Sequence, residues 1–315
     1  MHALRDLSFE LNPGESLGFV GESGSGKSIT GLSILGLLAR NAKIESGEIF
    51  FHQTDLLKAR AAELEKIRGS KISMVFQDPM SALNPCFTVG FQLGEVLRIH
   101  QGLTGNSLKD RMIELLNQVG IPDPQGRLKA YPHELSGGMS QRVIIAISIA
   151  CRPELLIADE PTTALDVTVQ KQIMKLLDQL RKQNKMSMIL VSHDLGLVSS
   201  WTDKILVMYA GESVEFGASK SLLESPKHPY TKGLMQSLPD LYPDPTKDFR
   251  LPTIPGVVPN LAQRPTGCQF SPRCGFMKPE CEVKPIAMRD NSRCLFSFQF
   301  SKHGEFQPLK NSELL

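Results

Sequence analysis

The chain has 315 residues, of which 41% are hydrophobic and 22% are charged, and its formal net charge is +2. These values are ordinary for a protein with a core, and the length allows one large α/β domain with an appendage. The small net charge gives no support to nucleic-acid binding or to a polybasic membrane anchor. Because the first residues lack a signal-peptide pattern and the strongest apolar run, residues 143–151, is too short for a bilayer, we expect membrane association only through a partner.

Strand-like and helix-like patterns alternate along most of the chain. Leu7, Phe9 and Leu11 alternate with polar residues, which predicts a half-buried strand. Further strands are predicted at residues 17–20, 47–51, 71–76, 155–158, 188–191 and 204–208. Helices are predicted at residues 27–38, 141–150 and 167–182, and helices with turns fill residues 79–133. This order predicts a mostly parallel sheet covered on both faces, with a helical insertion at about residues 79–150.

A glycine-rich segment follows the strand predicted at residues 17–20. It consists of Gly21, Glu22, Ser23, Gly24, Ser25, Gly26, Lys27 and Ser28. Its glycines let the backbone curl so that N–H groups point at phosphate oxygens, and the helix that follows adds its positive end. Lys27 can bridge the outer phosphates, and the hydroxyl of Ser28 can ligate Mg²⁺. The flanking strand and helix favour a nucleotide-binding loop over an ordinary Gly/Ser-rich turn.

Polar residues also end other predicted strands. Asp159 and Glu160 follow residues 155–158, Gln77 follows residues 71–76, and His193 follows residues 188–191 after one serine. In an open α/β sheet, ligands bind at the carboxyl ends of the strands. Asp159 can hold Mg²⁺ through its water shell, and Glu160 can orient or deprotonate water. Any one of these residues can be structural, but together they favour a catalytic edge.

Two further features belong with these residues: the turn of Ser136, Gly137 and Gly138, and Asp166 in the turn at residues 163–166. Taken in chain order, all of them match the motif set of ABC transporter ATPases. The chain resembles that family over about residues 3–225. Within it, the chain is most similar to the ATP-binding subunits of bacterial dipeptide and oligopeptide importers, through residues 76–85, 116–124, 136–143 and 228–231. The resemblance implies an ABC-type P-loop NTPase domain at residues 1–225 and a small cysteine-containing extension at residues 226–315.

The resemblance also implies a head-to-tail pair of ATPase domains. Each ATP would lie between the phosphate loop of one subunit and Ser136, Gly137 and Gly138 of the other, with Asp166 also at the nucleotide. The implied catalytic residues are Lys27, Gln77, Glu160 and His193, and the implied Mg²⁺ ligands are Ser28, Gln77 and Asp159. His193 would contact the γ-phosphate, and Gln77 would report to the membrane partner. Catalysis would then be mostly positioning and charge stabilisation.

The expected function is ATP hydrolysis that energises uptake of dipeptides or short oligopeptides, at the cytoplasmic face of the bacterial inner membrane. The resemblance implies two membrane-spanning permeases, a second ATPase subunit that is a sibling, and indirectly an extracytoplasmic peptide-binding protein. Nucleic acid is not expected. One alternative is a soluble ABC ATPase that acts on nucleic acid or the ribosome, which the near-neutral charge disfavours. Another is a catalytically weak partner ATPase, which the intact motif residues disfavour.

The beginning of the chain departs from the family. Related subunits have an additional strand before the segment that matches residues 2–5, and an aromatic residue from that region stacks on adenine. We expect either that this edge strand and aromatic residue are missing or that the start codon is assigned too late.

Four of the six cysteines, Cys268, Cys274, Cys281 and Cys294, lie close to the end of the chain, separated by 5, 6 and 12 residues. This spacing matches neither the close pairs of structural zinc sites nor a ferredoxin run. Four thiolates are nevertheless a complete ligand set for Zn²⁺ or a [4Fe–4S] cluster. Because the segment is proline-rich, a metal would supply much of its folding energy. The resemblance to importers with a similar cysteine tail favours the cluster over Zn²⁺, and free thiols are the third alternative.

Overall fold

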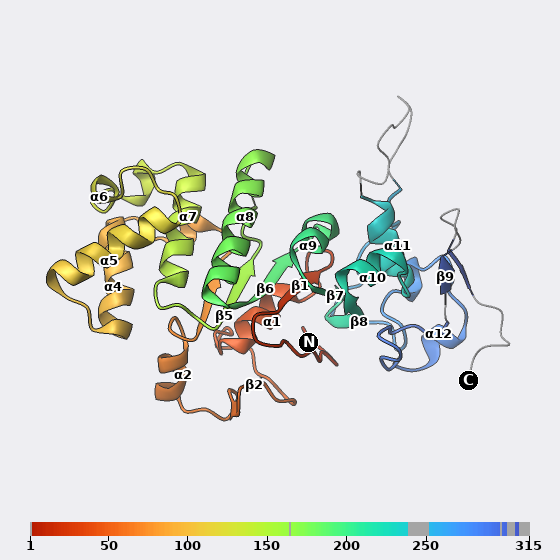
Figure 1. The fold of residues 1–315 in the computed structure, drawn as a ribbon. Coiled ribbons are helices and arrows are strands. Elements are labelled where there is room, and N and C mark those ends of the chain that lie inside the picture. The colour runs from red at the N-terminus through yellow and green to blue at the C-terminus, as the bar shows by residue number, and fades with distance from the viewer. Residues whose placement is uncertain (1, 164, 239–251, 297, 301–305, 309–315) are drawn as a thin grey trace. The chain divides into compact units, whose positions relative to one another are not determined.

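The computed structural model describes residues 2–163, 165–238, 252–296, 298–300 and 306–308. The chain divides into two compact units (Figure 1). The first unit contains Met1–Glu10, Ser16–Thr30 and Ser192–Leu315, and the second contains Leu11–Glu15 and Gly31–Val191. Met1 lies outside the described residues, and so does Ala164, which belongs to the turn at residues 163–166.

Three parallel strands form the core of the second unit. They are β4 (Ile72–Val75), β5 (Leu155–Asp159) and β6 (Ser187–Ser192), and they hydrogen-bond in that order. Ile72 lies beside Leu155, and Leu155 lies beside Ser187. Every residue of these strands is buried, which explains why the sequence shows unbroken apolar runs here instead of alternation. Asp159 is the last residue of β5, so the strand carries its carboxylate directly.

Helices make up most of the rest of this unit. They are α2 (Ala61–Ile67), α3 (Pro79–Ala82), α4 (Val89–Gln101), α5 (Gly105–Gln118), α6 (Pro124–Arg127), a 3-10 helix (Pro132–Glu134), α7 (Gly137–Ile149) and α8 (Val167–Asn184). A short hairpin pairs β2 (Phe50–Phe51) with β3 (Thr54–Asp55), so the strand predicted at residues 47–51 is much shorter than expected. Figure 1 shows α4, α5, α6 and α7 gathered into a helical group, as the insertion predicts. Ser148 of α7 donates a hydrogen bond to the carbonyl of Met74 at 3.1 Å, which fastens α7 to β4.

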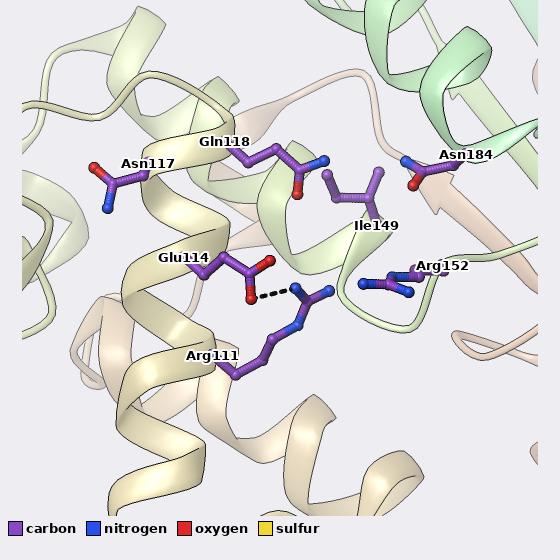
Figure 2. A pocket seen from close by; sticks show the side chains of 7 residues that line it. All are labelled: Arg111, Glu114, Asn117, Gln118, Ile149, Arg152 and Asn184. Atoms are coloured by element: carbon purple, nitrogen blue, oxygen red, sulfur yellow. Dashed lines mark ion pairs between the residues drawn. The ribbon is translucent and has the colours of Figure 1, made fainter.

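A cavity of about 400 Å³ opens among these helices, and two guanidinium groups, those of Arg111 and Arg152, face into it (Figure 2). Three lining residues are the last residues of their helices: Gln118 of α5, Ile149 of α7 and Asn184 of α8. Arg111 pairs with Glu114 at 2.7 Å and donates to the carbonyl of Ala150 at 3.5 Å. Because helix C-termini carry partial negative charge, the guanidinium groups complement them, and the cavity needs no anionic ligand to explain its charge.

The first unit contains three strands of the main sheet, β1, β7 and β8. Strand β1 (Ser16–Val20) runs parallel to β7 (Lys204–Tyr209), which pairs antiparallel with β8 (Glu212–Ala218) through a register shift between Val207 and Met208. The helices α9 (Leu195–Trp201) and α10 (Ser219–Glu224) belong to this unit, and α1 (Lys27–Ile34) begins in it. In the part of the chain that the structure describes, no helix is both long enough and apolar enough to cross a membrane.

The strand predicted at residues 7–11 is not formed. Leu7, Phe9 and Leu11 are half-buried and the residues between them are exposed, as the alternation predicts, but no ladder is assigned to this segment among the described residues. Phe9 packs edge-on against Phe19 at 5.2 Å between ring centroids. The alternation of apolar and polar residues therefore reflects packing of one side of an irregular segment. A strand also needs a neighbouring strand to hydrogen-bond with, and an alternating sequence does not provide one.

The predicted extension packs on the rest of the first unit through aromatic rings. Its described elements are α11 (Pro229–Gln236), a 3-10 helix (Ser271–Arg273), α12 (Glu280–Val283) and the antiparallel pair β9 (Phe298–Phe300) and β10 (Phe306–Pro308). Phe270 lies 5.3 Å from Tyr209 and 5.3 Å from Tyr230, and the two tyrosine rings lie 4.7 Å apart. Both tyrosines are fully buried, so the extension shares a core with β7.

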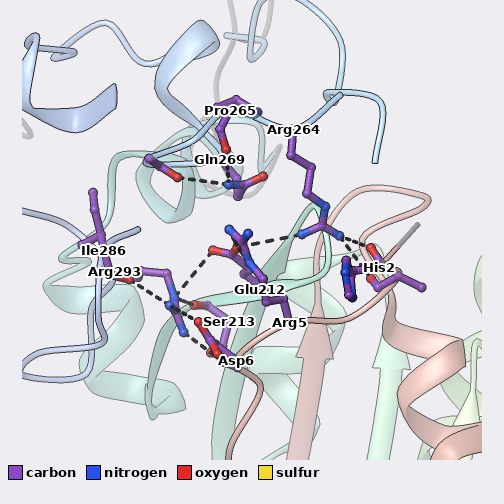
Figure 3. Close-up of polar contacts among 12 residues, drawn as sticks. His2, Arg5, Asp6, Glu212, Ser213, Arg264, Pro265, Gln269, Ile286 and Arg293 are labelled. Carbon is purple, nitrogen blue, oxygen red and sulfur yellow. Dashed lines mark hydrogen bonds and ion pairs between the residues drawn. The ribbon is translucent and has the colours of Figure 1, made fainter. Parts of the chain in front are cut away.

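A buried carboxylate lies beside this core. Glu212 is contacted by Arg5 at 2.5 Å, by Arg264 at 3.8 Å and by Arg293 at 3.9 Å (Figure 3). Arg293 also donates to the carbonyl groups of Ser213 and Ile286. The carboxylate of Glu212, the first residue of β8, thus contacts an arginine near the N-terminus and two arginines of the extension.

The segment at residues 228–231 begins with a second buried polar group. His228 is 1% exposed, and its Nδ1 accepts the N–H of Tyr230 at 3.1 Å. The backbone N–H groups of Lys227 and His228 both donate to the carboxylate of Glu215 at 2.8 Å. Burial lowers the pKa of His228 to about 3 and raises the pKa of Glu215.

His228 is expected to make stability depend on pH. Its folded pKa is about 3, and an unfolded histidine titrates at about 6.5. Between these values only the unfolded state binds the proton, so stability is complete above the unfolded pKa and falls as the pH drops. We expect a loss of about 2 kcal/mol between about pH 7 and about pH 5 from this group.

The matched variant is His228→Asn, whose amide oxygen can accept the N–H of Tyr230 but does not titrate. The melting temperatures of both proteins are measured across this pH range. Glu215, whose raised pKa acts in the opposite direction, is present in both and cancels in the comparison. A difference between the two melting temperatures that stays constant with pH contradicts the prediction.

Candidate functional site

The glycine-rich segment after β1 adopts a tight loop that ends in α1. Gly26 has a φ of 97°, which favours glycine, and a Cβ on Gly21 would lie 2.1 Å from the carbonyl oxygen of Met208. Lys27 is 5% exposed, and its ammonium group donates to the carbonyl oxygens of Gly21 at 2.7 Å and Glu22 at 3.0 Å. The lysine therefore folds back on the loop whose ligand it is expected to bind, while Ser28 follows it in the first turn of α1.

Two residues of the extension, Tyr230 and Arg273, contact Glu22, the second residue of the loop. The N–H of Glu22 donates to the hydroxyl of Tyr230 at 2.9 Å. The guanidinium of Arg273 forms a bidentate pair with the Glu22 carboxylate, at 2.5 and 2.9 Å. Hydrogen bonding to Glu22 raises the pKa of Arg273, so the guanidinium stays charged. Sequence analysis did not identify Arg273, because its only local signal is its place beside Cys274.

In the second unit, two predicted catalytic residues are in direct contact. The side-chain amide of Gln77 donates to Oε2 of Glu160 at 2.9 Å, and the hydroxyl of Thr163 donates to the same oxygen at 2.9 Å. Glu160 has a φ of 44°, an unusual conformation for this residue type that tends to occur at functional sites. Asp159, directly before it, is 5% exposed. A glutamine and two carboxylates are therefore held at the ends of β4 and β5.

The predicted Ser-Gly-Gly turn is the amino-terminal end of α7. Ser136 is the N-cap residue, and its hydroxyl accepts the N–H of Met139 at 3.3 Å. Ser136 and Gly137 are exposed and Gly138 is partly exposed. Helix N-termini present free N–H groups and partial positive charge, so this turn can receive a phosphate group.

Asp166 and His193 occupy helix-start and strand-end positions. Asp166 is the N-cap residue of α8, and its carboxylate accepts the N–H of Val169 at 2.9 Å. This contact gives Asp166 a structural role beside the predicted nucleotide contact. His193 directly follows β6 and is exposed. The phosphate loop and His193 belong to the first unit, whereas Gln77, Ser136, Asp159, Glu160 and Asp166 belong to the second.

The four cysteines of the extension line one pocket. Cys268, Cys274, Cys281 and Cys294 share it with aromatic residues such as Phe270, Phe276 and Phe298. All six cysteines of the chain are among the described residues, and all are free thiols. Burial raises the pKa of Cys268 to about 12 and that of Cys294 to about 11, so both stay protonated without a metal. Among the residues that the structure describes, no three Cys, His, Asp or Glu side chains are grouped closely enough to hold a metal ion.

The pocket therefore brings together four cysteines that could bind a metal, but the described side chains are not grouped closely enough to bind one as they stand. Four thiols are the donor set that Zn²⁺ and iron–sulfur clusters prefer, and they surround one space. A metal would have to draw the sulfur atoms together and displace their protons, which is the usual coupling of metal binding to folding and to pKa.

Comparisons with known proteins agree with these features. The ABC transporter family model matches residues 4–163, and the model of the oligopeptide/dipeptide transporter C-terminal region matches residues 214–281. The dipeptide transport ATP-binding protein DppD of Haemophilus influenzae is 51% identical over 292 residues, which are 92% of this chain and 88% of that protein. DppD of Escherichia coli strain K12 is 48% identical over 286 residues, which are 91% of this chain and 86% of that protein.

Solved structures support the same fold. The dimeric structure of a post-hydrolysis state of the ATP-binding cassette MJ0796, bound to ADP and Pi, matches with a TM-score of 0.62 and 29% identity. The match covers 69% of this chain and 90% of that chain. The predicted α/β fold, an ABC-type nucleotide-binding domain with a mostly parallel sheet, is thus confirmed.

Proposed function

The chain belongs to the ABC transporter family, and from this premise we propose that it is the ATP-hydrolysing subunit of an importer for dipeptides or short oligopeptides. The observation that carries the ATPase assignment is the contact between Gln77 and Glu160 at the ends of two neighbouring strands, since it places a carboxylate base next to a water-orienting amide. The peptide substrate class is supported by the match of residues 214–281 to the peptide-transporter C-terminal region and by the names of the relatives. That match also disfavours a nucleic-acid or ribosome ATPase.

Each motif residue has a role in this proposal. The phosphate loop, residues 21–28, cradles the phosphates through its backbone N–H groups, and Lys27 turns from the carbonyls of Gly21 and Glu22 to the outer phosphates. Glu160 accepts a proton from the attacking water, Gln77 orients that water, and His193 contacts the γ-phosphate. Catalysis then depends mostly on positioning and charge stabilisation.

Magnesium is the metal that fits the nucleotide-binding residues. Ser28, Gln77 and Asp159 supply hydroxyl, amide and carboxylate oxygens, which are the ligands that Mg²⁺ prefers. When bound, Mg²⁺ neutralises charge on the β- and γ-phosphates. Asp159 is fixed by its place as the last residue of β5, so its carboxylate can act without reorganisation of the strand.

The turn at Ser136 acts on ATP held by a second ATPase subunit. This turn caps α7 and is exposed, and its N–H groups suit a γ-phosphate that arrives from outside the chain. The mate is a sibling subunit, and Asp166 contributes beside the same nucleotide. A chain on its own would then lack donors for its own ATP and hydrolyse it slowly.

The membrane partners are two permease subunits, which bind the helical insertion. Phe87 and Phe91 stack at 4.4 Å between centroids and are 42% and 43% exposed, in the segment that follows Gln77. Exposed stacked rings of this kind suit an apolar helix from a partner. The chain would lie peripherally at the cytoplasmic face of the bacterial inner membrane, with an extracytoplasmic peptide-binding protein as an indirect partner. In this arrangement residues 1–225 form the ATPase domain and residues 226–315 the extension.

The four cysteines of the extension hold a [4Fe–4S] cluster, with Zn²⁺ as the alternative. Support comes from the donor set of Cys268, Cys274, Cys281 and Cys294 around one pocket. The cluster would add folding energy to the apolar packing that aromatic residues such as Phe270 and Phe276 supply around this pocket.

Replacing Glu160 with Gln is expected to lower ATP turnover by the assembled transporter by at least about a hundredfold, because the base is lost while shape is kept. ATP binding is retained, so a closed pair of ATPase subunits accumulates. Phosphate release and pair formation in size-exclusion chromatography measure the two effects. Glu65→Gln, at an exposed glutamate of α2, is the control. Brisk hydrolysis by the Glu160 variant would falsify the assignment.

Replacing Ser136 with Ala is expected to slow turnover in the transporter by about a hundredfold, as for loss of a transition-state donor. The isolated chain should bind ATP with unchanged affinity, because its own phosphate loop is intact. Equilibrium binding and turnover are compared with those of Ser107→Ala, at an exposed serine of α5. Weaker ATP binding by the isolated variant contradicts a role on the partner's nucleotide.

Protein purified without air is expected to contain about four iron and about four sulfide per chain, with visible absorption. Cys274→Ser should lose the iron and melt at a lower temperature, since metal binding contributes folding energy. Cys86→Ser, at an exposed cysteine outside the set, should keep both. A colourless wild-type chain that contains zinc refutes the cluster and supports the alternative.

A further inference from the structure

We propose that Arg273 is a positioning residue of the phosphate loop, which neutralises and anchors Glu22 so that the loop can accept the phosphates of ATP. The inference rests on the proposed ATPase function and adds a residue outside the nucleotide motifs. It would make the extension part of the nucleotide site, because Arg273 belongs to the extension and contacts Glu22, 251 positions away in sequence.

The geometry of the contact supports a dedicated pair. Both terminal nitrogens of Arg273 donate to Glu22, one to each carboxylate oxygen, at 2.5 and 2.9 Å. The Arg273 side chain is 4% exposed, whereas that of Glu22 is 30% exposed. A bidentate pair with one buried partner is fixed in direction, unlike the loose pairs that long side chains form on a surface.

Arg273 is itself held in place by several neighbours. Its Nε donates to the carbonyl of Pro255 at 2.8 Å, and Nη2 donates to that of Ile254 at 3.2 Å. Nη1 also donates to the hydroxyl of Tyr209 at 3.2 Å, and the guanidinium lies 5.7 Å from the centre of that ring. The arginine therefore belongs to a rigid part of the extension, and it can fix a loop residue instead of following it.

Charge explains why the loop needs this partner. A phosphate loop binds a polyanion, and Glu22 places a carboxylate inside the loop itself. Without a counter-charge, this carboxylate would repel the incoming phosphates across a partly buried site, where screening is weak. Arg273 cancels that charge through the side chain of Glu22 alone and engages none of the backbone N–H groups of the loop.

Position matters as well as charge. The N–H of Glu22 is already engaged by Tyr230, and its carbonyl oxygen accepts from Lys27. Holding the side chain through Arg273 completes the restraint of this residue. When Lys27 turns to a phosphate, the carbonyl that it leaves then stays where it was, and the loop keeps its shape for the nucleotide.

The test is a charge-repair series in the full-length chain: Arg273→Gln, Arg273→Lys, Glu22→Gln and the double variant Glu22→Gln with Arg273→Gln. The dissociation constants for MgATP and for adenosine are measured by calorimetry, together with melting temperatures. Arg289→Gln, at an exposed arginine of the same extension, is the control.

Arg273→Gln is expected to weaken MgATP binding about tenfold and to leave adenosine binding unchanged, because the loss of a charge pair acts only on the phosphates. Arg273→Lys, which keeps charge but not the bidentate geometry, should lose about threefold. Glu22→Gln should bind MgATP about threefold more tightly, and the double variant should recover most of the loss of Arg273→Gln. In the assembled transporter the effect should appear in KM for ATP and not in kcat.

Three results overturn the inference: unchanged MgATP affinity in Arg273→Gln, an equal loss for adenosine, or no recovery in the double variant. The last two would mean that Arg273 acts only on folding. If Arg273→Gln does not fold, Arg273→Lys and Glu22→Gln decide the question, and weaker MgATP binding in Glu22→Gln contradicts the charge argument. Failure of the wild-type chain to bind MgATP would instead refute the proposed function.

Discussion

The first unit depends on one buried carboxylate, that of Glu212. Three guanidinium groups, from Arg5, Arg264 and Arg293, gather around it, and those of Arg264 and Arg293 are buried. Removing one partner from such a group costs several kcal/mol, because the remaining charges lose both water and partner. Glu212 begins β8, which pairs with β7, and β7 pairs with the strand that leads into the phosphate loop. The extension is therefore part of the nucleotide-binding fold rather than a tail.

In the second unit, α7 links two elements of the proposed cycle. Its first turn is the Ser136 cap, and its far half is buried against β4, with Ser148 bonded to Met74. The next residues after β4 lead to Gln77. A displacement of the turn by a partner's nucleotide would thus be transmitted by packing to the strand that carries the glutamine, since closely packed elements move together.

Sequence patterns could place the predicted nucleotide motifs at strand ends and helix starts because the signals for those positions are local. Lys27 directly follows Gly26, Ser28 comes next, and Asp159 follows an apolar run, so each side chain is placed by its own element. The pair of Arg273 with Glu22 and the contact of Gln77 with Glu160 join residues 251 and 83 positions apart, and no local pattern encodes them. The segment at residues 7–11 failed as a strand for the same reason, since a strand needs a neighbour that alternation does not provide.

The hydrogen bonds that Glu160 makes in this structure affect which of its oxygens could accept a proton from water. One oxygen of this carboxylate already accepts hydrogen bonds from Gln77 and Thr163. Because a carboxylate oxygen has two lone pairs, a proton from water would have to go to the other oxygen while both donors stay in place. The resting contacts therefore limit the positions from which a water molecule can reach Glu160, and a movement of Gln77 or Thr163 would widen that choice.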